Sequence, residues 1–387
     1  MTARTELFLT ESALRRHRGV KWRAEGDDVL AAWIADMDFA VAAPIRAALE
    51  ELVATSDLGY PPGPATPLRA AFAERMAARY GWSVDPDAVR ETTDVIQGLQ
   101  IALALGTAPG DPVALLTPSY PPFLATLSEM GRPLVALAME DDGTRAGIDP
   151  ARYAAAIASA GARALIIVNP HNPTGRCLTR AELEALAAIA ERHDLLVICD
   201  EIHAELTFDG RTHVPFASLG ASIAERTVTL TSATKAFNIA GARCALSHFG
   251  PSWLRARRDA CPSHLYGQPS ALGVAATLAA WRSGEPWLAL VREVLEENRD
   301  HLAARLAAEL PAASHRPAEA TYLAWLDLRA CGLGDDPAAT LRTRARIALS
   351  PGPSFGPGGR GHARLNFATS PTLLDALIDR LVGACRP

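Results

Sequence analysis

The chain has 387 residues, of which 49% are hydrophobic and 21% charged, with a formal net charge of -5 and a pI near 6.1. A chain of this length can bury a substantial core and is long enough for two domains. The acidic balance argues against a nucleic-acid-binding surface, and no apolar run reaches the length needed to cross a bilayer.

The N-terminal segment predicts a protein that stays in the cytoplasm. Residues 1–18 are polar and charged and lack the apolar stretch of a signal peptide. The six cysteines lie far apart, without a CxxC pair or the spacing of metal ligands, which predicts free thiols in a reducing compartment and no metal site.

Short apolar runs alternate with helical periodicity through the middle of the chain. The predicted strands cover residues 113–116, 134–137, 164–168, 195–199 and 227–231. This alternation is typical of an α/β fold with an open, mostly parallel sheet, whose binding sites lie at the carboxyl ends of the strands.

A second, smaller unit follows this sheet. A long helical region over residues 270–309 leads to predicted strands near 321–328 and 364–368, which indicates a smaller α+β C-terminal domain. The predicted division is an N-terminal segment 1–40 that packs on the small domain, a large domain 41–280 and a small domain 281–387. The Gly/Pro-rich stretch 350–361 is predicted to be a rigid loop, with a flexible linker as the alternative.

An anion site is predicted where a helix begins after Asp94. Asp94 is a plausible N-cap for the helical run 98–105, and the backbone amides of Val95 and Ile96 would then point at a bound anion such as phosphate. Ser232 and Arg243 are the other candidate phosphate ligands. The segment has no glycine-rich loop, so its prediction depends on the other motifs.

Asp200 ends a predicted buried strand and faces the expected ligand crevice. A buried, ionised carboxylate needs a cationic partner, which a protonated pyridine nitrogen would provide. The alternative is an Asp that only caps the following segment. Glu201 should point to the opposite face because side chains alternate along a strand.

Two further candidates flank this strand in sequence. Asn172 lies in the loop 169–175, which two prolines and a glycine restrict, before a helix that starts with capping-box spacing at Thr179. Its amide could bind a phenolic oxygen, although an Asx turn is the alternative. His203 could bind the same oxygen or stack nearby, or it could be purely structural.

Lys235 follows the strand 227–231 and is one of only two lysines in the chain, the other being Lys21. A surface lysine is the common alternative, but Lys235 lies among apolar and small residues, a setting that suits a neutral amine able to form a Schiff base. Arg243 could be the cation that lowers its pKa. With Asp200 and Asn172, Lys235 provides the groups that pyridoxal 5'-phosphate (PLP) requires from a protein.

These residues resemble the fold type I PLP enzymes, the aspartate aminotransferase superfamily, and within it the cystathionine β-lyase-like C-S lyase branch typified by MalY and PatB. The resemblance runs almost end to end. The segments that carry it are VKW at 20–22, WIADMDF at 33–39, GYP at 59–61, TPSYPPF at 117–123, DEIH at 200–203, PG at 351–352 and RLNF at 364–367.

The resemblance implies a role for each cofactor-binding residue. Lys235 would form the Schiff base, Asp200 would face the pyridine nitrogen, Asn172 would bind the phenolic oxygen, and Tyr120 would stack on the ring. His203 is the residue that this branch typically has at its position, where most aminotransferases have Tyr.

The resemblance also implies a homodimer with shared active sites and a small amino-acid substrate. Tyr60 would reach in from the neighbouring subunit and take part in catalysis. Arg364 would bind the substrate α-carboxylate, with Asn172 beside it.

Three functions compete. The first is β-elimination of a thiol from L-cystathionine or another L-cysteine S-conjugate. The second is transamination, which Arg243 favours because ordinary aminotransferases have an arginine there. The third is a PLP-fold protein kept as a binding or regulatory module, which the intact set of Lys235, Asp200, Asn172 and Arg364 opposes.

Overall fold

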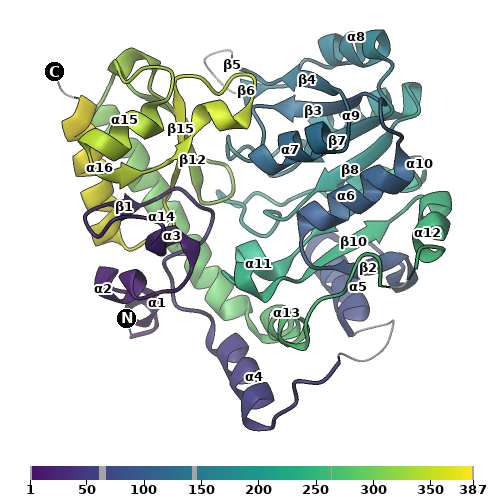
Figure 1. Ribbon diagram of the computed structural model, residues 1–387, viewed down its shortest axis with the longest axis horizontal. Coiled ribbons are helices and arrows are strands. Elements are labelled where there is room, and N and C mark those ends of the chain that lie inside the picture. Colours follow the sequence, from purple (N-terminus) through teal and green to yellow (C-terminus); the bar gives the residue numbers. More distant parts are fainter. Residues whose placement is uncertain (1, 61–66, 142–145, 263, 386–387) are drawn as a thin grey trace.

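The computed structural model describes residues 2–60, 67–141, 146–262 and 264–385, and its main element is a seven-stranded sheet (Figure 1). The strand order is β2-β10-β9-β8-β7-β3-β4. The strands are β2 (Val89–Thr92), β3 (Val113–Thr117), β4 (Leu134–Ala138), β7 (Ala164–Val168), β8 (Leu196–Asp200), β9 (Thr227–Thr231) and β10 (Ala245–Phe249). Strands β4, β3, β7, β8 and β9 are parallel, which confirms the predicted α/β sheet.

Strands β2 and β10 were missing from the prediction, and they make one edge of the sheet antiparallel. Their sequences lack the apolar runs of the other strands. In β10, Ser247 and His248 are buried although polar, and Ser247 pairs with Arg90 of β2. Strand β10 pairs with β9 and β2 pairs with β10, so both strands owe their formation to tertiary pairing, which a local sequence pattern does not reveal.

Helices cover both faces of the sheet because its strands are buried on both sides. Ile166 and Ile198 belong to one core cluster, and their neighbours Ile167 and Val197 belong to another on the opposite face. The first face is covered by α6 (Val95–Gly106), α7 (Pro121–Glu129) and α12 (Ser252–Asp259). The second is covered by α8 (Pro150–Ala160), α9 (Arg180–Arg192), η2 (Phe216–Leu219) and α10 (Ala221–Ala224). Figure 1 shows α6 and α7 in front of the sheet.

The small unit is a four-stranded antiparallel sheet with three helices, as expected for the α+β part. Its strands, in the order β11-β12-β15-β14, are β11 (Ser314–His315), β12 (Leu323–Asp327), β15 (His362–Asn366) and β14 (Ser350–Pro351). Its helices are α14 (Glu285–Glu309), α15 (Pro337–Arg344) and α16 (Pro371–Cys385), with the short turns η4 (Arg329–Cys331) and η5 (Gly352–Phe355). The predicted helical region 270–309 is therefore two helices, α13 (Ala271–Ser283) and α14, separated at Gly284.

The N-terminal segment packs on this small unit. It contains α1 (Thr2–Leu7), α2 (Glu11–Arg15), α3 (Val20–Arg23) and β1 (Leu30–Ala31). Strand β1 pairs in parallel with β13 (Ile347–Ala348), and the Asn366 amide donates hydrogen bonds to the carbonyls of Ile34 and Asp36 at 2.7 Å. The three-part division of the chain at residues 40 and 280 stays a prediction.

Seven further elements lie between those already named. They are α4 (Ala43–Ala54), α5 (Pro67–Tyr80), η1 (Pro86–Ala88), β5 (Glu140–Asp141), β6 (Ala146–Gly147), α11 (Ala233–Ala236) and η3 (Ala240–Ala242). Helix α4 projects from the lower end of the molecule in Figure 1. Within the described ranges, every helix is too short or too polar to cross a bilayer.

Candidate active site

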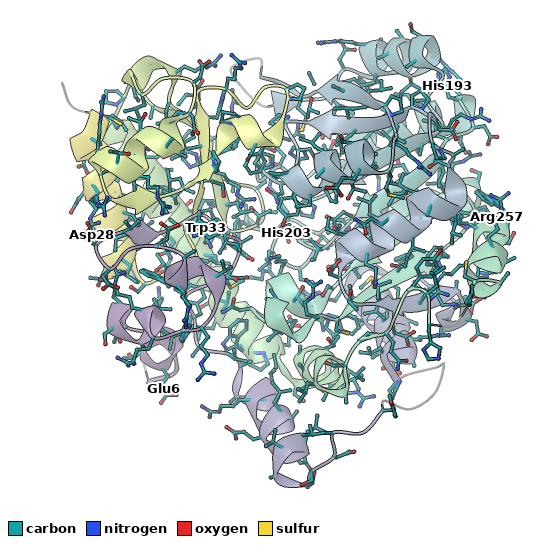
Figure 2. The ribbon with its side chains drawn as sticks, in the orientation of Figure 1. Glu6, Asp28, Trp33, His193, His203 and Arg257 are labelled. Atoms are coloured by element: carbon teal, nitrogen blue, oxygen red, sulfur yellow. The ribbon has the colours of Figure 1, made fainter. Side chains whose placement is uncertain are left out.

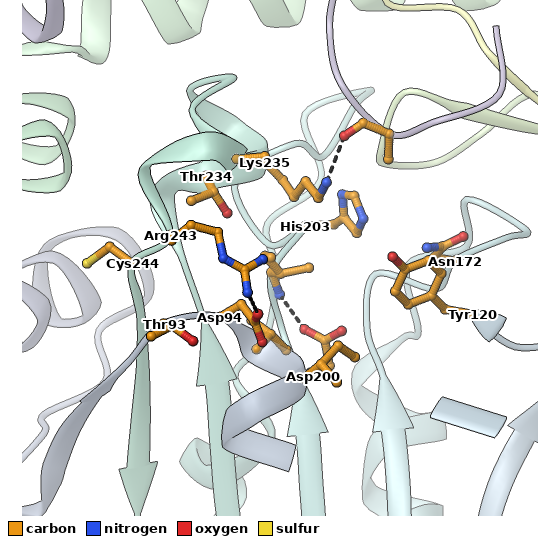
Figure 3. Close-up of a pocket in the computed structure, with 15 residues that line it drawn as sticks. Thr93, Asp94, Tyr120, Asn172, Asp200, His203, Thr234, Lys235, Arg243 and Cys244 are labelled. Atoms are coloured by element: carbon orange, nitrogen blue, oxygen red, sulfur yellow. Dashed lines mark hydrogen bonds and ion pairs between the residues drawn. The ribbon is translucent and has the colours of Figure 1, made fainter. Parts of the chain in front are cut away.

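A cavity of about 170 Å³ lies at the carboxyl edge of the parallel strands, as expected for this fold (Figure 3). It lies where β8 and β9 end and where α6 and α11 begin. Eight of the predicted site residues line it: Val95, Ile96, Tyr120, Asn172, Asp200, His203, Lys235 and Arg243.

Lys235 lies in α11, the short helix that follows β9, and its side chain is half-buried. The ammonium Nζ donates a hydrogen bond to the carbonyl oxygen of Ala35 at 2.7 Å. Burial lowers the pKa of Lys235, and the positive charge of Arg364 lowers it further, while Asp36 and Asp200 act in the opposite direction. From the sequence, Arg243 was the candidate for this effect; in the structure the cation that lowers the pKa of Lys235 is Arg364.

Asp200 is the last residue of β8 and is fully enclosed. Burial raises its pKa to about 7, and the neighbouring Glu201 carboxylate adds to the rise. One oxygen accepts a hydrogen bond from the Ile202 amide at 3.0 Å. Glu201 points to the other face, where it binds the His213 ring and the Phe216 amide, as the strand alternation predicted.

The first turn of α6 forms the anion-binding end of the cavity. Asp94 caps this helix by accepting a hydrogen bond from the Gln97 amide at 2.7 Å, which confirms the predicted cap. Val95 and Ile96 follow it at the cavity wall, where a helix start presents free amides. Arg243 forms an ion pair with Asp94, so a cation lies beside these amides.

Ser232 is the one predicted phosphate ligand that the structure does not place on the cavity lining. Its hydroxyl caps α11 by accepting from the Thr234 amide at 3.1 Å, and it donates to the carbonyl of Cys244 at 2.6 Å. Thr234 and Cys244 line the cavity instead. The Ser232 hydroxyl is therefore already engaged, and its contact with phosphate stays a prediction.

Two rings, those of Tyr120 and His203, line the cavity. Tyr120 precedes α7, and its ring packs edge-on against Phe123 at 5.8 Å between centroids. The His203 ring contacts Tyr322 edge-on at 5.9 Å, and burial lowers the pKa of His203 to about 3, so it is neutral at physiological pH. Figure 2 shows His203 near the centre of the molecule.

Arg364 lies in β15 of the small unit, outside the cavity lining, and contacts Asn172 on its wall. Its Nη1 donates to the Asn172 side-chain oxygen at 2.8 Å, and Nη2 donates to the Trp33 carbonyl and the Ser350 hydroxyl, both at 3.0 Å. Its buried Nε has no hydrogen-bond partner among the described residues. Buried donors are normally paired, so an unpaired one indicates a partner that binds there. A bound carboxylate could accept this hydrogen bond.

Tyr60 lies away from this cavity. It is 96% exposed and precedes residues 61–66, which lie outside the described residues. The predicted role of Tyr60 therefore requires the active site of a second subunit.

Two groups beside Lys235 could not be identified from the sequence, the Ala35 carbonyl and the Tyr322 hydroxyl. The Tyr322 hydroxyl donates to the same Ala35 carbonyl at 2.8 Å, so this oxygen accepts from both Tyr322 and Lys235. A backbone carbonyl has no signature in the sequence, and a buried Tyr follows the same pattern as core residues. Only the segment 33–39, noted above for its resemblance to the lyase branch, pointed to this region.

The cavity residues match the chemical demands of PLP. An amine of lowered pKa suits Schiff-base formation, and an enclosed carboxylate whose pKa is raised needs a cation such as a protonated pyridine nitrogen. The helix start beside Arg243 suits the phosphate, and Tyr120 offers an aromatic face. The residues therefore fit the cofactor.

Comparison with known proteins agrees with this geometry. Residues 35–381 match the family described as aminotransferase class I and II. The chain belongs to this family. Its cofactor is PLP, and it is a PLP-dependent enzyme of fold type I.

Individual relatives include both lyases and aminotransferases. Cystathionine beta-lyase PatB of Bacillus subtilis is 35% identical over 93% of this chain and 95% of its own. The crystal structure of cystalysin from Treponema denticola, which contains PLP, is 28% identical with a TM-score of 0.91 and covers 97% of this chain and 98% of its own. N-succinyldiaminopimelate aminotransferase from Mycobacterium tuberculosis is 29% identical with a TM-score of 0.82, covering 91% and 92%.

Proposed function

We propose that this enzyme is a carbon-sulfur β-lyase that cleaves L-cystathionine or a related L-cysteine S-conjugate. With one water, the substrate yields the free thiol, pyruvate and ammonia. The observation that carries the proposal is the 35% identity to a cystathionine β-lyase along nearly the whole of both chains. When bound, PLP supplies an electron sink that stabilises negative charge at the substrate α-carbon.

The residues in and beside the cavity bind the substrate, transfer the proton and keep the cofactor charged. The free Nε of Arg364 binds the substrate α-carboxylate together with the Asn172 amide, which fixes the plane of the amino acid. The Lys235 amine, of lowered pKa, accepts the α-proton. The Asp200 carboxylate keeps a positive charge on the pyridine nitrogen, and burial of the site excludes water from these groups.

A direct assay tests the reaction type. With L-cystathionine and no keto acid, thiol and pyruvate should appear in equal amounts. Arg364→Lys should lose about tenfold or more of this turnover, because a lysine point charge does not fix the carboxylate plane. If thiol release is absent across several S-conjugates, the β-lyase assignment is wrong.

Transamination is the second candidate, supported by Arg243 at the cavity wall and by the likeness to an aminotransferase structure. In that case the enzyme would consume a keto acid with an amino-acid donor and release no thiol. The same reaction mixtures, supplied with a keto acid, distinguish the two reactions.

We further propose that the working enzyme is a homodimer in which Tyr60 acts in the partner's site. The support is its 96% exposure, together with the exposed apolar residues Val53 and Leu58 of the same region. Mixing Tyr60→Phe subunits with Lys235→Ala subunits should restore about a quarter of the wild-type activity, since half of the dimers are hybrids with one intact site. A fully active monomer in light scattering would contradict this.

A further inference from the structure

A second cavity, of about 440 Å³, lies between the large and small units, and we refer to it as the interlobe cavity. On one side it is lined by the end of β3 and the loop 174–176, and on the other by β12, β15 and the loop that holds Pro357 and Gly358. It is larger than the PLP cavity and shares no lining residue with it. The proposed lyase reaction makes no use of it.

The interlobe cavity lies directly behind the wall of the active site. Pro118 on its lining is two residues before Tyr120, and Thr174 is two residues after Asn172. Across the small sheet, Trp325 on its lining is the register partner of Arg364.

Phe355 fills the space between the two cavities. Its ring lies 5.2 Å from Trp325 and 5.0 Å from the Arg364 guanidinium. Its carbonyl accepts a hydrogen bond from the Ser119 amide at 2.9 Å, which ties the small unit to the large one at this wall. A ligand in the interlobe cavity would therefore contact both units without reaching PLP.

The charged lining favours an anion. It includes three arginines and two carboxylates: Arg176, Arg316, Arg329, Glu319 and Asp327. Arg329 pairs with Asp327, and Arg176 pairs with Glu319 and with Glu182 outside the lining, so the preference for an anion depends on the donor atoms that these pairs leave unused.

Two buried side chains on this lining have polar atoms without a hydrogen bond. Arg176 is 5% exposed; its Nη2 binds Glu182 at 2.7 Å and its Nε lies 3.9 Å from the Glu319 carboxylate, but Nε and Nη1 make no hydrogen bond among the described residues. The Thr117 hydroxyl, 1% exposed, also has none there. Buried polar groups are normally paired, so these two indicate a partner of hydrogen-bonding character.

The lining also has aromatic and apolar side chains. The Trp325 ring stacks on His362 at 5.1 Å with an interplanar angle of 11°, and Pro118, Pro357 and Met139 form further walls. Such surfaces suit an aromatic ring, which packs well by stacking or edge contact.

We propose that the interlobe cavity is a second binding site, for a small aromatic carboxylate. The ring lies against Trp325 and the prolines, and the carboxylate accepts hydrogen bonds from Arg176 and Thr117. Because the site is built from both units, its ligand stabilises their packed arrangement.

Calorimetric titration of the holoenzyme with phenylacetate tests this site. We expect saturable binding, and at least tenfold weaker binding of the neutral phenylacetamide, which loses the charge-assisted hydrogen bonds. Ser314→Trp, an exposed lining position in β11, should weaken phenylacetate binding about tenfold or more by filling the cavity. Ser12→Trp, an exposed position in α2, is the matched control and should leave binding unchanged.

Substitutions at Thr117 and Arg364 test which cavity phenylacetate occupies. Thr117→Val should weaken binding about fivefold through the loss of one hydrogen bond, and Thr117→Ser should retain it. Arg364→Lys should leave binding within about twofold, because Arg364 does not line the interlobe cavity. The proposal is wrong if phenylacetate does not bind, if phenylacetamide binds equally well, or if Arg364→Lys abolishes binding while Ser314→Trp does not.

Discussion

Replacing Asp200 with Asn should stabilise the apoenzyme and lower its affinity for PLP. Asp200 is enclosed at the end of β8, and its hydrogen bond from the Ile202 amide can be kept by an Asn oxygen. The substitution therefore removes a buried negative charge while preserving shape.

The size of the effect follows from the pKa of Asp200. Burial raises this pKa from 3.8 to about 7. At about 1.4 kcal/mol per pKa unit, the ionised carboxylate costs the folded apoenzyme about 4 kcal/mol. Because the folded pKa is the higher one, this cost is absent below pH ~4 and grows as the pH rises to about 7.

The positive pyridine nitrogen of PLP offsets this cost. A charge pair at about 4 Å contributes about 4 kcal/mol at an effective dielectric of 20. Without the carboxylate, PLP should bind on the order of 10³-fold more weakly.

Urea unfolding of the wild-type and Asp200→Asn apoenzymes, at pH 4.5 and pH 8, measures the first effect. The unfolding free energy of the variant relative to the wild type should rise by about 3–4 kcal/mol between these pH values. Absorbance titration with PLP measures the second. A difference that does not change with pH, together with unchanged PLP affinity, would refute the reasoning.

Two further predictions concern the pKa of Lys235 and the packing of the large unit. Arg364→Met should raise the pKa of Lys235, because it removes the positive charge that lowers it. Labelling of the Lys235 amine by an acylating reagent in the apoenzyme should then be half-maximal at a higher pH. Arg243→Met is the control and should leave this pH profile unchanged. Peptide mapping is simple because the chain has only two lysines. Gly250→Ala should lower the midpoint of thermal unfolding by several degrees, because an added Cβ would lie 1.9 Å from a backbone oxygen. Gly241→Ala is the control; an added Cβ there has open space, so its midpoint should stay within about a degree of the wild type. Equal midpoints for the two variants would contradict the packing.

The sequence predicted the parallel strands and their order along the chain because each is an apolar run with its own local signal. It also predicted the caps at Asp94 and Thr179, both of which the structure confirms. A cap depends on residues three positions apart, so it can be predicted from the sequence without knowledge of the tertiary structure.

In the candidate site too, some residues could be predicted from the sequence and others could not. Lys235, Asp200 and Asn172 could be named from the sequence because each follows a strand whose end must lie at the ligand edge of a parallel sheet. The sequence assigned the wrong cation to Lys235, since Arg243 is near in sequence while Arg364 is near in space.

The sequence by itself determined the fold class, the strand ends that face PLP, and the residue types that its chemistry requires, because these depend on local patterns of hydrophobicity and polarity. Only the tertiary structure decided which distant groups meet there. The Ala35 carbonyl that accepts from both Lys235 and Tyr322 comes from the N-terminal segment, and Arg364 reaches Asn172 from the small unit. Such contacts arise from the packing of whole units, and the energy of that packing is spread over many residues rather than encoded in any one segment.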